Sequence, residues 1–248
     1  MRYHGGKSRQ GYIIANIINN ILEENTSLSY LEPFCGMCGV LRYIVTDNII
    51  VAGDINDSVI QMWTALQDGW QPEISNVNEE YYNDMKANGE SSAEKGFFGV
   101  ALTFGALYFQ VFMSKLVDLL PYSKKSVIQI SKDIPDVIFI HGDYTTFSTT
   151  DNCVIFCDPP YEKYNRYYDE NNNKLKFDHD LFWEWCCRMC MNNNIVVVIE
   201  NPDFFSRETL EGVQLEKVTI SNRISRFGKT KTKIEEVVGI FKNFKLSV

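Results

Sequence analysis

The chain of 248 residues has no apolar run close to the roughly 18 residues that a membrane-spanning helix needs. It also lacks the charged start and short apolar core of a secretory leader. The sequence therefore predicts a soluble protein of the cytoplasm, or of the host cell interior if the chain is viral. With 45% hydrophobic residues, the chain can still bury a full core.

Histidine is scarce, and cysteine follows neither a disulfide pattern nor a clear metal-binding pattern. The odd number of cysteines, seven, scattered along the chain, favours a reducing compartment. The pairs Cys35/Cys38 and Cys187/Cys190 have the spacing of zinc ligands. We expect no metal, because the first pair lies in a glycine-containing turn and the second in an apolar helical pattern. His179, after Asp178 at a predicted helix start, is interpreted as structural.

Basic residues are in deficit, with 24 Lys and Arg against 32 Asp and Glu and a net charge of −8. Because neutralisation of phosphates supplies much of a protein's affinity for nucleic acid, this negative net charge predicts modest, salt-sensitive binding. The distribution of the basic residues along the chain matters more than the net charge. Between positions 217 and 233 there are six basic residues and no acid, which predicts a nucleic-acid face there. These six are Lys217, Arg223, Arg226, Lys229, Lys231 and Lys233.

The most informative segment present is Asp158-Pro159-Pro160-Tyr161, which follows an apolar run. Proline has no N–H and a fixed φ, so a strand that meets two prolines ends there. The loop then presents a carboxylate, the Pro159 carbonyl and an aromatic ring. The two acceptors suit an exocyclic amine, and Tyr161 can stack on a flat, nitrogen-bearing ring. The simpler interpretation, a tight turn with a solvated aspartate, loses weight because of two segments upstream.

The first of these segments is Tyr30 to Gly39, an apolar strand that leads into a glycine-containing turn and a helical pattern over 40–45. A second strand, at about 49–53, ends in Asp54. Such a turn lets a nucleoside-bearing cofactor approach the backbone, and a carboxylate at the next strand's tip can bind both ribose hydroxyls. There is no Walker lysine motif, so the ligand need not carry phosphates.

The second upstream segment is Tyr3-His4-Gly5-Gly6-Lys7, ahead of a helical pattern of isoleucines from Ile13 to Leu22. Two glycines before a lysine make a flexible loop, which can place the Lys7 ammonium beside a carboxylate. On its own the segment would equally fit a solvated chain start.

Taken together, the three segments resemble the DNA adenine-N6 methyltransferase family. The resemblance is to the group in which Gly-Gly-Lys comes first, the cofactor motif next, a target-recognition insert after it, and Asp-Pro-Pro-Tyr last. It covers most of the chain. It implies S-adenosyl-L-methionine as cofactor, with Asp143 meeting the adenine amino group of that cofactor. The catalytic residues that it implies are Asp158, Pro159, Pro160 and Tyr161. The cofactor-binding residues that it implies are Tyr3, Gly6, Lys7, Glu32, Pro33, Phe34, Gly36, Cys38, Gly39, Asp54, Ile55, Asp143, Tyr144 and Asp158.

One position departs from the family pattern, which usually reads Phe-x-Gly-x-Gly. Here Cys38 stands at the second glycine, and Gly39 follows one place later. Cysteine is small, so we expect the turn to tolerate it.

The expected fold is a Rossmann-like methyltransferase fold, with a mostly parallel sheet and helices on both faces. Its strands are predicted at about 28–32, 49–53, 137–140, 153–157 and 195–199, with the motifs at their carboxyl ends. We expect residues 1–70 and 136–248 to form the catalytic domain. The resemblance makes 71–135 an inserted, largely helical target-recognition domain, and most of its aromatic residues are expected to form a small core.

The implied reaction is direct methyl transfer to N6 of an adenine that is flipped out of duplex DNA. Asp158 and Pro159 would hold the amine, and Asp158 would act mainly by position and charge. The expected partner is double-stranded DNA, and the resemblance also allows for a cognate restriction endonuclease and for a monomer or a homodimer. The candidate DNA-binding residues are Lys163, Arg166, Arg223, Arg226, Lys229 and Lys231.

Three other interpretations remain open from the residues. An RNA adenine-N6 methyltransferase would share the Asp158 loop and the cofactor turn. A protein glutamine methyltransferase would be expected to carry Asn in place of Asp158. A DNA-binding module that lost its cofactor through Cys38 is the non-enzymatic alternative.

Overall fold

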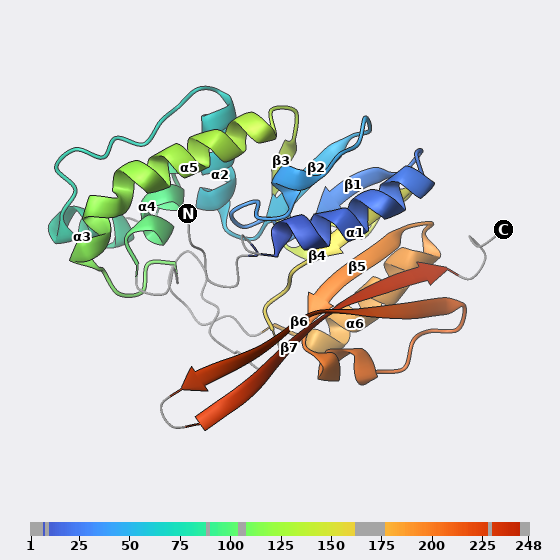
Figure 1. The fold of residues 1–248 in the computed structure, drawn as a ribbon. Helices are drawn as coiled ribbons and strands as arrows, with labels where there is room; N and C mark the ends of the chain where they lie inside the picture. The colour runs from blue at the N-terminus through green and yellow to red at the C-terminus, as the bar shows by residue number, and fades with distance from the viewer. Residues whose placement is uncertain are drawn as a thin grey trace.

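The computed structural model describes residue 7 and residues 10–87, 90–103, 108–161, 177–227 and 230–243. Its core is a sheet of seven strands in the order β3-β2-β1-β4-β5-β7-β6 (Figure 1). Strands β1 to β5 run parallel, and β7 is antiparallel to both of its neighbours. The strands are β1 Ser29–Glu32, β2 Ile50–Asp54, β3 Ile138–His141, β4 Cys153–Cys157, β5 Ile195–Glu200, β6 Val213–Phe227 and β7 Thr230–Asn243. The predicted Rossmann-like fold is confirmed, as are all five predicted strands.

The sheet is covered on both faces, as the alternation of buried side chains along β4 requires. Val154 and Phe156 belong to one core cluster, whereas Ile155 and Cys157 belong to the other. The first cluster lies under α1 Gly11–Glu24, α2 Asp57–Gln67, α4 Ala93–Ala101 and α5 Leu120–Asp133. The second lies under α6 His179–Met191 and the short 3-10 helices η4 Tyr144–Phe147 and η5 Pro202–Ser206. Parallel strands buried on both faces read as continuous apolar runs, which is why they were visible in the sequence.

The prediction of a helix over residues 40–45 is wrong, because only one 3-10 turn, η1 Leu41–Tyr43, forms there. The side chain of Asn19 on α1 explains the early end. Its Nδ2 donates to the carbonyl of Tyr43 at 2.9 Å, and its Oδ1 accepts from the amide of Val45 at 3.0 Å. The chain is extended at Ile44, between these two contacts. The helical pattern from Ile13 to Leu22 is confirmed as α1.

The segment 71–135 contains α3 Glu79–Ala87, α4, η3 Ser114–Leu119 and α5. Helix α4 packs directly on α2: a Cβ on Gly96 would lie 2.1 Å from the carbonyl oxygen of Ser58. Phe97, Phe98 and Phe109 are buried in the same cluster as α1 and the sheet. The helices of this segment are therefore continuous with the main core, and a role in target recognition stays a prediction.

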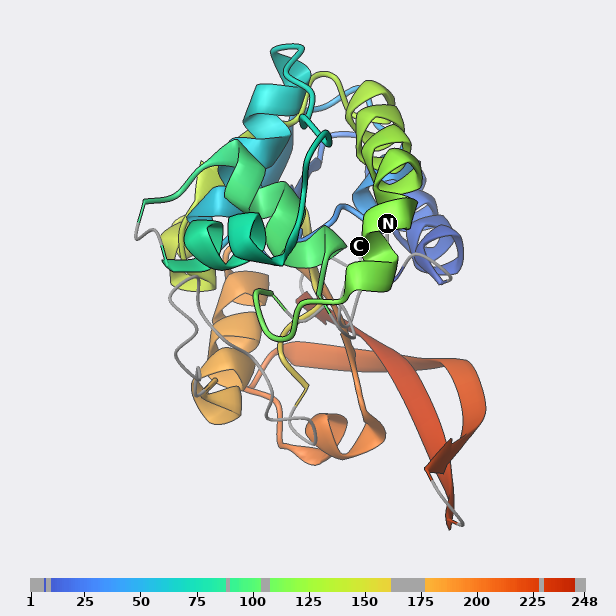
Figure 2. The ribbon, with the colours of Figure 1, turned by 90° about the vertical axis from the view of Figure 1, so that its left-hand side faces the viewer.

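Strands β6 and β7 form a long hairpin that continues past the rest of the sheet (Figures 1 and 2). Val237 is the β7 residue that pairs with Glu200, the last residue of β5. Residues 221–227 and 230–236 therefore extend beyond the carboxyl edge of the parallel strands. Neither strand was predicted, because the sequence of the projecting part shows no apolar alternation. Within the described residues, no helix has both the length and the apolar character needed to cross a bilayer.

Candidate functional site

The Asp158 loop lies at the carboxyl edge of the sheet, directly after β4. The Nζ of Lys7 lies 2.7 Å from Oδ1 of Asp158, and their side chains are 5% and 17% exposed. The same ammonium lies over the ring of Tyr161, 4.7 Å from its centroid. The structure thus confirms that Lys7 lies beside a carboxylate, and that carboxylate belongs to Asp158.

Two opposed effects act on the Asp158 carboxyl. Burial raises its pKa above the ordinary value, since the charged form is poorly solvated there. The neighbouring Lys7 ammonium lowers it, and the charge of Glu236 raises it. The ion pair keeps a carboxylate in a nearly dry site, where an isolated charge would be costly.

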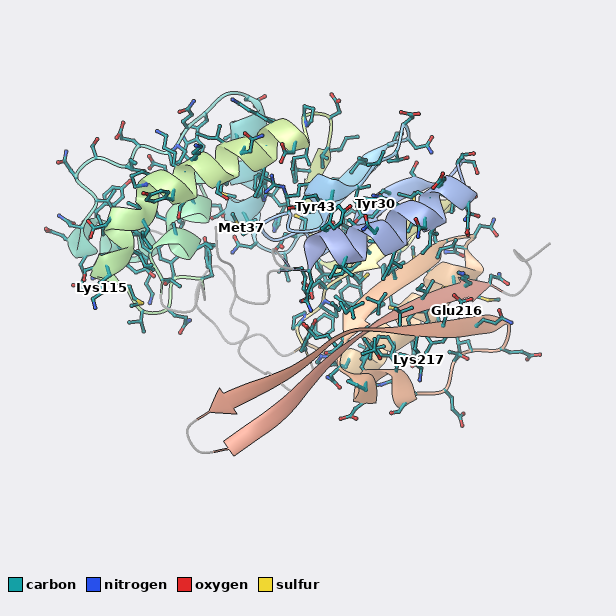
Figure 3. The ribbon with its side chains drawn as sticks, in the orientation of Figure 1. Tyr30, Met37, Tyr43, Lys115, Glu216 and Lys217 are labelled. Atoms are coloured by element: carbon teal, nitrogen blue, oxygen red, sulfur yellow. The ribbon has the colours of Figure 1, made fainter. Side chains whose placement is uncertain are left out.

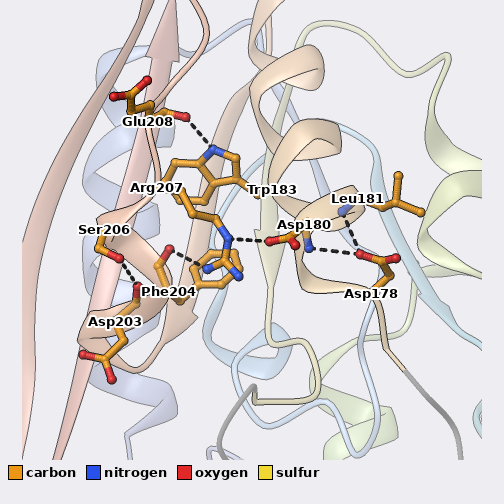
Figure 4. Close-up of polar contacts among 9 residues, drawn as sticks. All are labelled: Asp178, Asp180, Leu181, Trp183, Asp203, Phe204, Ser206, Arg207 and Glu208. Atoms are coloured by element: carbon orange, nitrogen blue, oxygen red, sulfur yellow. Dashed lines mark hydrogen bonds and ion pairs between the residues drawn. The ribbon is translucent and has the colours of Figure 1, made fainter.

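The loop is held from the side of α6 by His179. Its Nε2 is 2.7 Å from the carbonyl oxygen of Pro160. His179 is the first residue of α6, and Asp178 caps that helix by accepting from the amides of Asp180 and Leu181 (Figure 4). The structural interpretation of His179 from the sequence did not foresee this contact with the Asp158 loop.

The start of α6 is fixed in turn to η5. Arg207 Nε donates to Asp180 Oδ1 at 2.9 Å, and Trp183 Nε1 donates to the carbonyl of Glu208 at 2.8 Å (Figure 4). The ring of Phe204 packs against that of Trp183, with ring centroids 5.3 Å apart. The histidine that contacts the Asp158 loop therefore stands on a well-anchored helix end.

On the other side of the loop lies Glu236 of β7, a residue that the sequence did not single out. Its Oε2 accepts from Gln10 Nε2 at 2.6 Å, and its Oε1 accepts from the Tyr161 hydroxyl at 3.3 Å. Gln10 is next to the first turn of α1. No sequence signal marked either residue, because 75 and 226 positions separate Glu236 from its two partners.

The predicted cofactor turn follows β1 and is fixed by backbone contacts. The amide of Cys35 donates to the carbonyl of Gly53 at 2.8 Å, and Trp63 Nε1 donates to the carbonyl of Gly36 at 2.8 Å. The amide of Gly36 donates to Oδ2 of Asp54 at 2.9 Å. The turn and the tip of β2 are thus joined directly, as the pairing of β1 with β2 requires.

Asp54 also receives the amide of Asn56 on Oδ1 at 2.9 Å. Burial raises the pKa of Asp54, and the amides of Asn56 and Gly36 lower it. The predicted cofactor residue Ile55 follows it and is 48% exposed. A carboxylate held by two backbone amides is well oriented to accept further hydrogen bonds from hydroxyls.

Glu32, the last residue of β1, is almost fully buried. Burial raises the pKa of Glu32 to about 8, the hydroxyl of Tyr30 lowers it, and the charge of Asp158 raises it. The Tyr30 hydroxyl donates to Glu32 Oε2 at 2.8 Å. Glu32 is therefore mainly protonated at neutral pH, and its neighbour Pro33 is buried as well.

The departure at Cys38 has a clear conformation in the structure. Cys38 is fully buried and has a φ of +53°, which lies in a region that residues other than glycine seldom adopt. Gly36 in the same turn also has a positive φ, of +43°. The predicted tolerance of cysteine is compatible with this turn, and the positive φ explains why a glycine suits the position. Gly39 lies against the start of α1, since a Cβ on Gly11 would come 2.0 Å from its carbonyl oxygen.

The aromatic residues assigned to the cofactor pack together at the edge of the second core cluster. Phe34 stacks on Tyr144 with ring centroids 5.8 Å apart. Asp143 caps η4, because its Oδ1 accepts from the amide of Thr145 at 3.0 Å and from the Thr145 hydroxyl at 2.8 Å. Tyr144 is buried, and desolvation is the main cause that raises its pKa to about 12. Asp143 thus stands at the tip of β3, as predicted, with Tyr144 in the core behind it.

Several predicted residues lie outside the described parts of the chain: Tyr3, Gly6, Lys163, Arg166 and Lys229. The backbone places Arg223 and Arg226 on the projecting part of β6 and Lys231 on that of β7. Lys217, from the same basic run, instead belongs to the body of the sheet (Figure 3). Its Nζ donates to the carbonyl of Phe205 at 2.7 Å.

The seven cysteines are all buried and unpaired by disulfides. Over the described ranges, no group of three or more His, Cys, Asp or Glu side chains is arranged to hold a metal ion. Burial raises the pKa of Cys35 and Cys38, so these thiols stay protonated in the turn.

No protein-family model and no curated protein matches the chain. Among solved structures, it aligns with a putative RNA methyltransferase from Pyrococcus horikoshii at 9% identity over 95% of this chain and 82% of that chain, with a TM-score of 0.45. It also aligns with a putative class I S-adenosylmethionine-dependent methyltransferase from Listeria monocytogenes, at 12% identity over 96% and 60% of the two chains, with a TM-score of 0.46. A third alignment, with TrmN from Thermus thermophilus, has 9% identity over 94% and 48% and a TM-score of 0.42.

Proposed function

We propose that this chain is an S-adenosyl-L-methionine-dependent methyltransferase that methylates N6 of a flipped-out adenine in duplex DNA. The observation that carries the proposal is the meeting of Lys7, Asp158 and Tyr161 at the carboxyl edge, one strand away from the Glu32–Gly39 turn. Three segments that resemble one family's motifs in sequence thus converge in space, where open α/β sheets bind their ligands.

The residues present at the turn suit this cofactor. The turn after β1 would hold the methionine part, Asp54 the ribose hydroxyls and Asp143 the adenine amino group. When bound, the cofactor supplies an electrophilic methyl group on a positively charged sulfonium. The carboxylates of Asp54 and Asp158 lie at the same edge, and their charges favour a cationic ligand.

The chemistry falls mainly on Asp158. Because Oδ1 is paired with Lys7, Oδ2 and the Pro159 carbonyl are the acceptors that we assign to the two amine hydrogens. Holding both hydrogens localises the nitrogen lone pair toward the methyl donor. The positive charge that develops on N6 is stabilised by the carboxylate. The methylated nitrogen becomes acidic only after transfer, so a strong base is not needed. The ion pair with Lys7, which makes Asp158 a weaker base, is therefore compatible with the proposed role.

Tyr161 is the proposed stacking platform for the flipped base, which recovers part of the cost of unstacking. The Lys7 ammonium already lies over the Tyr161 ring, so a stacked base would use the opposite face. The hairpin beyond the carboxyl edge carries Arg223, Arg226 and Lys231, which we assign to phosphate contacts.

The proposal is tested with cofactor labelled in its methyl group, incubated with the wild-type chain and with Asp158→Ala. The acceptors are mixed-sequence duplex DNA and an RNA duplex of the same sequence, with analysis for N6-methyladenine. We expect label in DNA adenine with wild type alone. Label confined to RNA would replace the proposal by RNA methylation. Calorimetry that shows no cofactor binding would overturn the proposal in favour of the non-enzymatic alternative, a DNA-binding module. Cofactor binding with no label in either polymer would overturn the proposed substrate.

A further inference from the structure

Glu236 stands where the β6–β7 hairpin leaves the sheet. It is the residue of β7 next to Val237, which makes the last pairing with β5. On the opposite strand, the register shifts between Thr219 and Ser221, and Ser221 is the partner of Glu236. A β-bulge bends a strand and changes its twist. The base of the projecting ribbon is therefore a distinct point in the fold, and Glu236 lies at that point.

From this point Glu236 contacts two elements that carry the proposed site. One carboxylate oxygen accepts from Gln10 and the other from the Tyr161 hydroxyl. Gln10 is almost fully buried, and its amide donates to the carbonyl of Lys7 at 2.8 Å. Lys7 pairs with Asp158 and lies over the Tyr161 ring. These contacts form a closed circuit through the hairpin, the start of α1 and the Asp158 loop.

The contacts constrain two placements that matter for the reaction. The hydroxyl contact limits how far the Tyr161 ring can tilt away from Glu236. The contact with Gln10 holds the residue whose amide donates to the Lys7 carbonyl, and so limits where the Lys7 ammonium can lie relative to Asp158. A group that fixes the orientation of others without touching the reacting atoms acts by positioning.

We propose that Glu236 is a positioning residue, which sets the Tyr161 ring and the Lys7 segment and couples the hairpin to the Asp158 loop. The inference rests on the proposed function for its catalytic consequence, whereas the coupling itself does not depend on it. A nucleic acid that displaces the hairpin would move Glu236, and both of its partners would follow. Engagement of the polymer and assembly of the base-binding site would then be one event.

The coupling is tested first by hydrogen exchange, which needs no activity. The variants are Glu236→Ala, Glu236→Gln and Glu216→Ala as the matched control. Glu216 is an acid of β6 in the body of the sheet, paired with Lys242 at 3.2 Å (Figure 3). Glu236→Ala is expected to speed exchange of the amides of Gln10, Gly11 and Tyr161 by about fivefold, the equivalent of one net hydrogen bond. Glu236→Gln keeps one acceptor oxygen for the Tyr161 hydroxyl but turns an N–H toward Gln10, so its exchange should lie closer to wild type than that of Glu236→Ala. Equal exchange in all variants overturns the coupling.

The catalytic consequence is tested by single-turnover methyl transfer with saturating cofactor. Glu236→Ala should lower the rate by about tenfold or more, because a misplacement of about 1 Å can cost about a hundredfold. Cofactor affinity should be unchanged, and Glu236→Gln should restore most of the rate. If Glu236 acts through the hydroxyl, Tyr161→Phe should add little to Glu236→Ala in a double-mutant cycle. Full additivity, or a slow Glu236→Gln, overturns the assignment. An inactive wild type would contradict the proposed function, and the exchange result would still decide the coupling.

Discussion

Lys7 and Asp158 form a mostly buried ion pair with an Nζ to Oδ1 distance of 2.7 Å, although 151 positions separate them along the chain. The pair joins the segment before α1 to the loop after β4, across the carboxyl edge of the sheet. Removing one partner of a buried pair is far more costly than removing an exposed one. The pair thus has consequences for both stability and reactivity.

Replacing Asp158 by alanine is expected to abolish methyl transfer and to leave cofactor binding largely intact, because its proposed partner is the target amine. The variant should also lose about 3–5 kcal/mol of unfolding free energy, since Lys7 loses its buried counter-charge. Calorimetry with the cofactor and denaturant unfolding are run beside the methyl-transfer assay. Asp158→Asn serves as the isosteric companion. A rate above about a tenth of wild type, under ~1.4 kcal/mol of barrier, would contradict the role.

Replacing Asp54 by alanine is expected to weaken cofactor binding by roughly 1.5–3 kcal/mol, the usual loss for a hydrogen bond to a charged acceptor. Because Asp54 also holds the amide of Gly36, Asp54→Asn is measured in parallel to keep one acceptor oxygen. The exposed Asp47→Ala is the control. An unchanged dissociation constant for Asp54→Ala in calorimetry would mean that the ribose is held elsewhere.

The positive φ of Cys38 leads to a comparison of two substitutions. Cys38→Gly and Cys38→Ala both remove the thiol, and they differ only in the Cβ. Because a Cβ is disfavoured at a φ of +53°, the glycine variant should be more stable than the alanine variant by about 1 kcal/mol. Denaturant unfolding measures the difference. Equal stabilities would show that the turn relaxes when the thiol is removed.

The raised pKa of Glu32 makes stability depend on pH. In the folded state this pKa is about 8 against the ordinary value of 4.5, so between these values the folded protein keeps a proton that the unfolded chain releases. Its contribution to stability is full below the unfolded pKa and is lost as pH rises through about 8. Within that window the unfolding free energy should fall by up to about 1.4 kcal/mol per pH unit.

Glu32→Gln mimics the protonated form and keeps an acceptor for the Tyr30 hydroxyl. Its unfolding free energy should therefore decline less with pH over the same window. Urea unfolding at a series of pH values compares the two proteins. Parallel curves would show that Glu32 is charged in the folded state at neutral pH.

Neutralising Arg223, Arg226 and Lys229 together should reduce DNA affinity without a change in cofactor affinity. The salt dependence should shrink by roughly 0.9 per lost phosphate contact. Target and non-target duplexes should be affected alike, since phosphate contacts carry no base information. Lys242→Gln is the matched control, a β7 cation in the body of the sheet. A wild-type affinity and salt slope in the triple variant would mean that the hairpin is only a solvated surface, and substitutions in 71–135 would then be compared for lost sequence discrimination.

The sequence by itself determined the parallel sheet and the motifs at its edge. Strands buried on both faces are continuous apolar runs, so β4 could be predicted from the sequence. Its end could be predicted too, because Asp158 and two prolines follow Cys157. The carboxyl ends of parallel strands share one edge of the sheet, so Asp54 and Asp158 could be predicted to lie at the same edge. These are local patterns with a fixed geometric consequence.

Only the tertiary structure decided what surrounds those motifs. The 3-10 turn in place of a helix after Val40 depends on Asn19 of another element, and the positive φ of Cys38 depends on the whole turn. The hairpin was not predicted, because about half of each strand extends past the parallel strands and lacks an apolar alternation. Glu236 and His179 reach the Asp158 loop only through β7 and α6, by contacts between residues far apart in the chain. Such contacts leave no periodic mark in a sequence, because they require one side chain at one position and nothing from its neighbours.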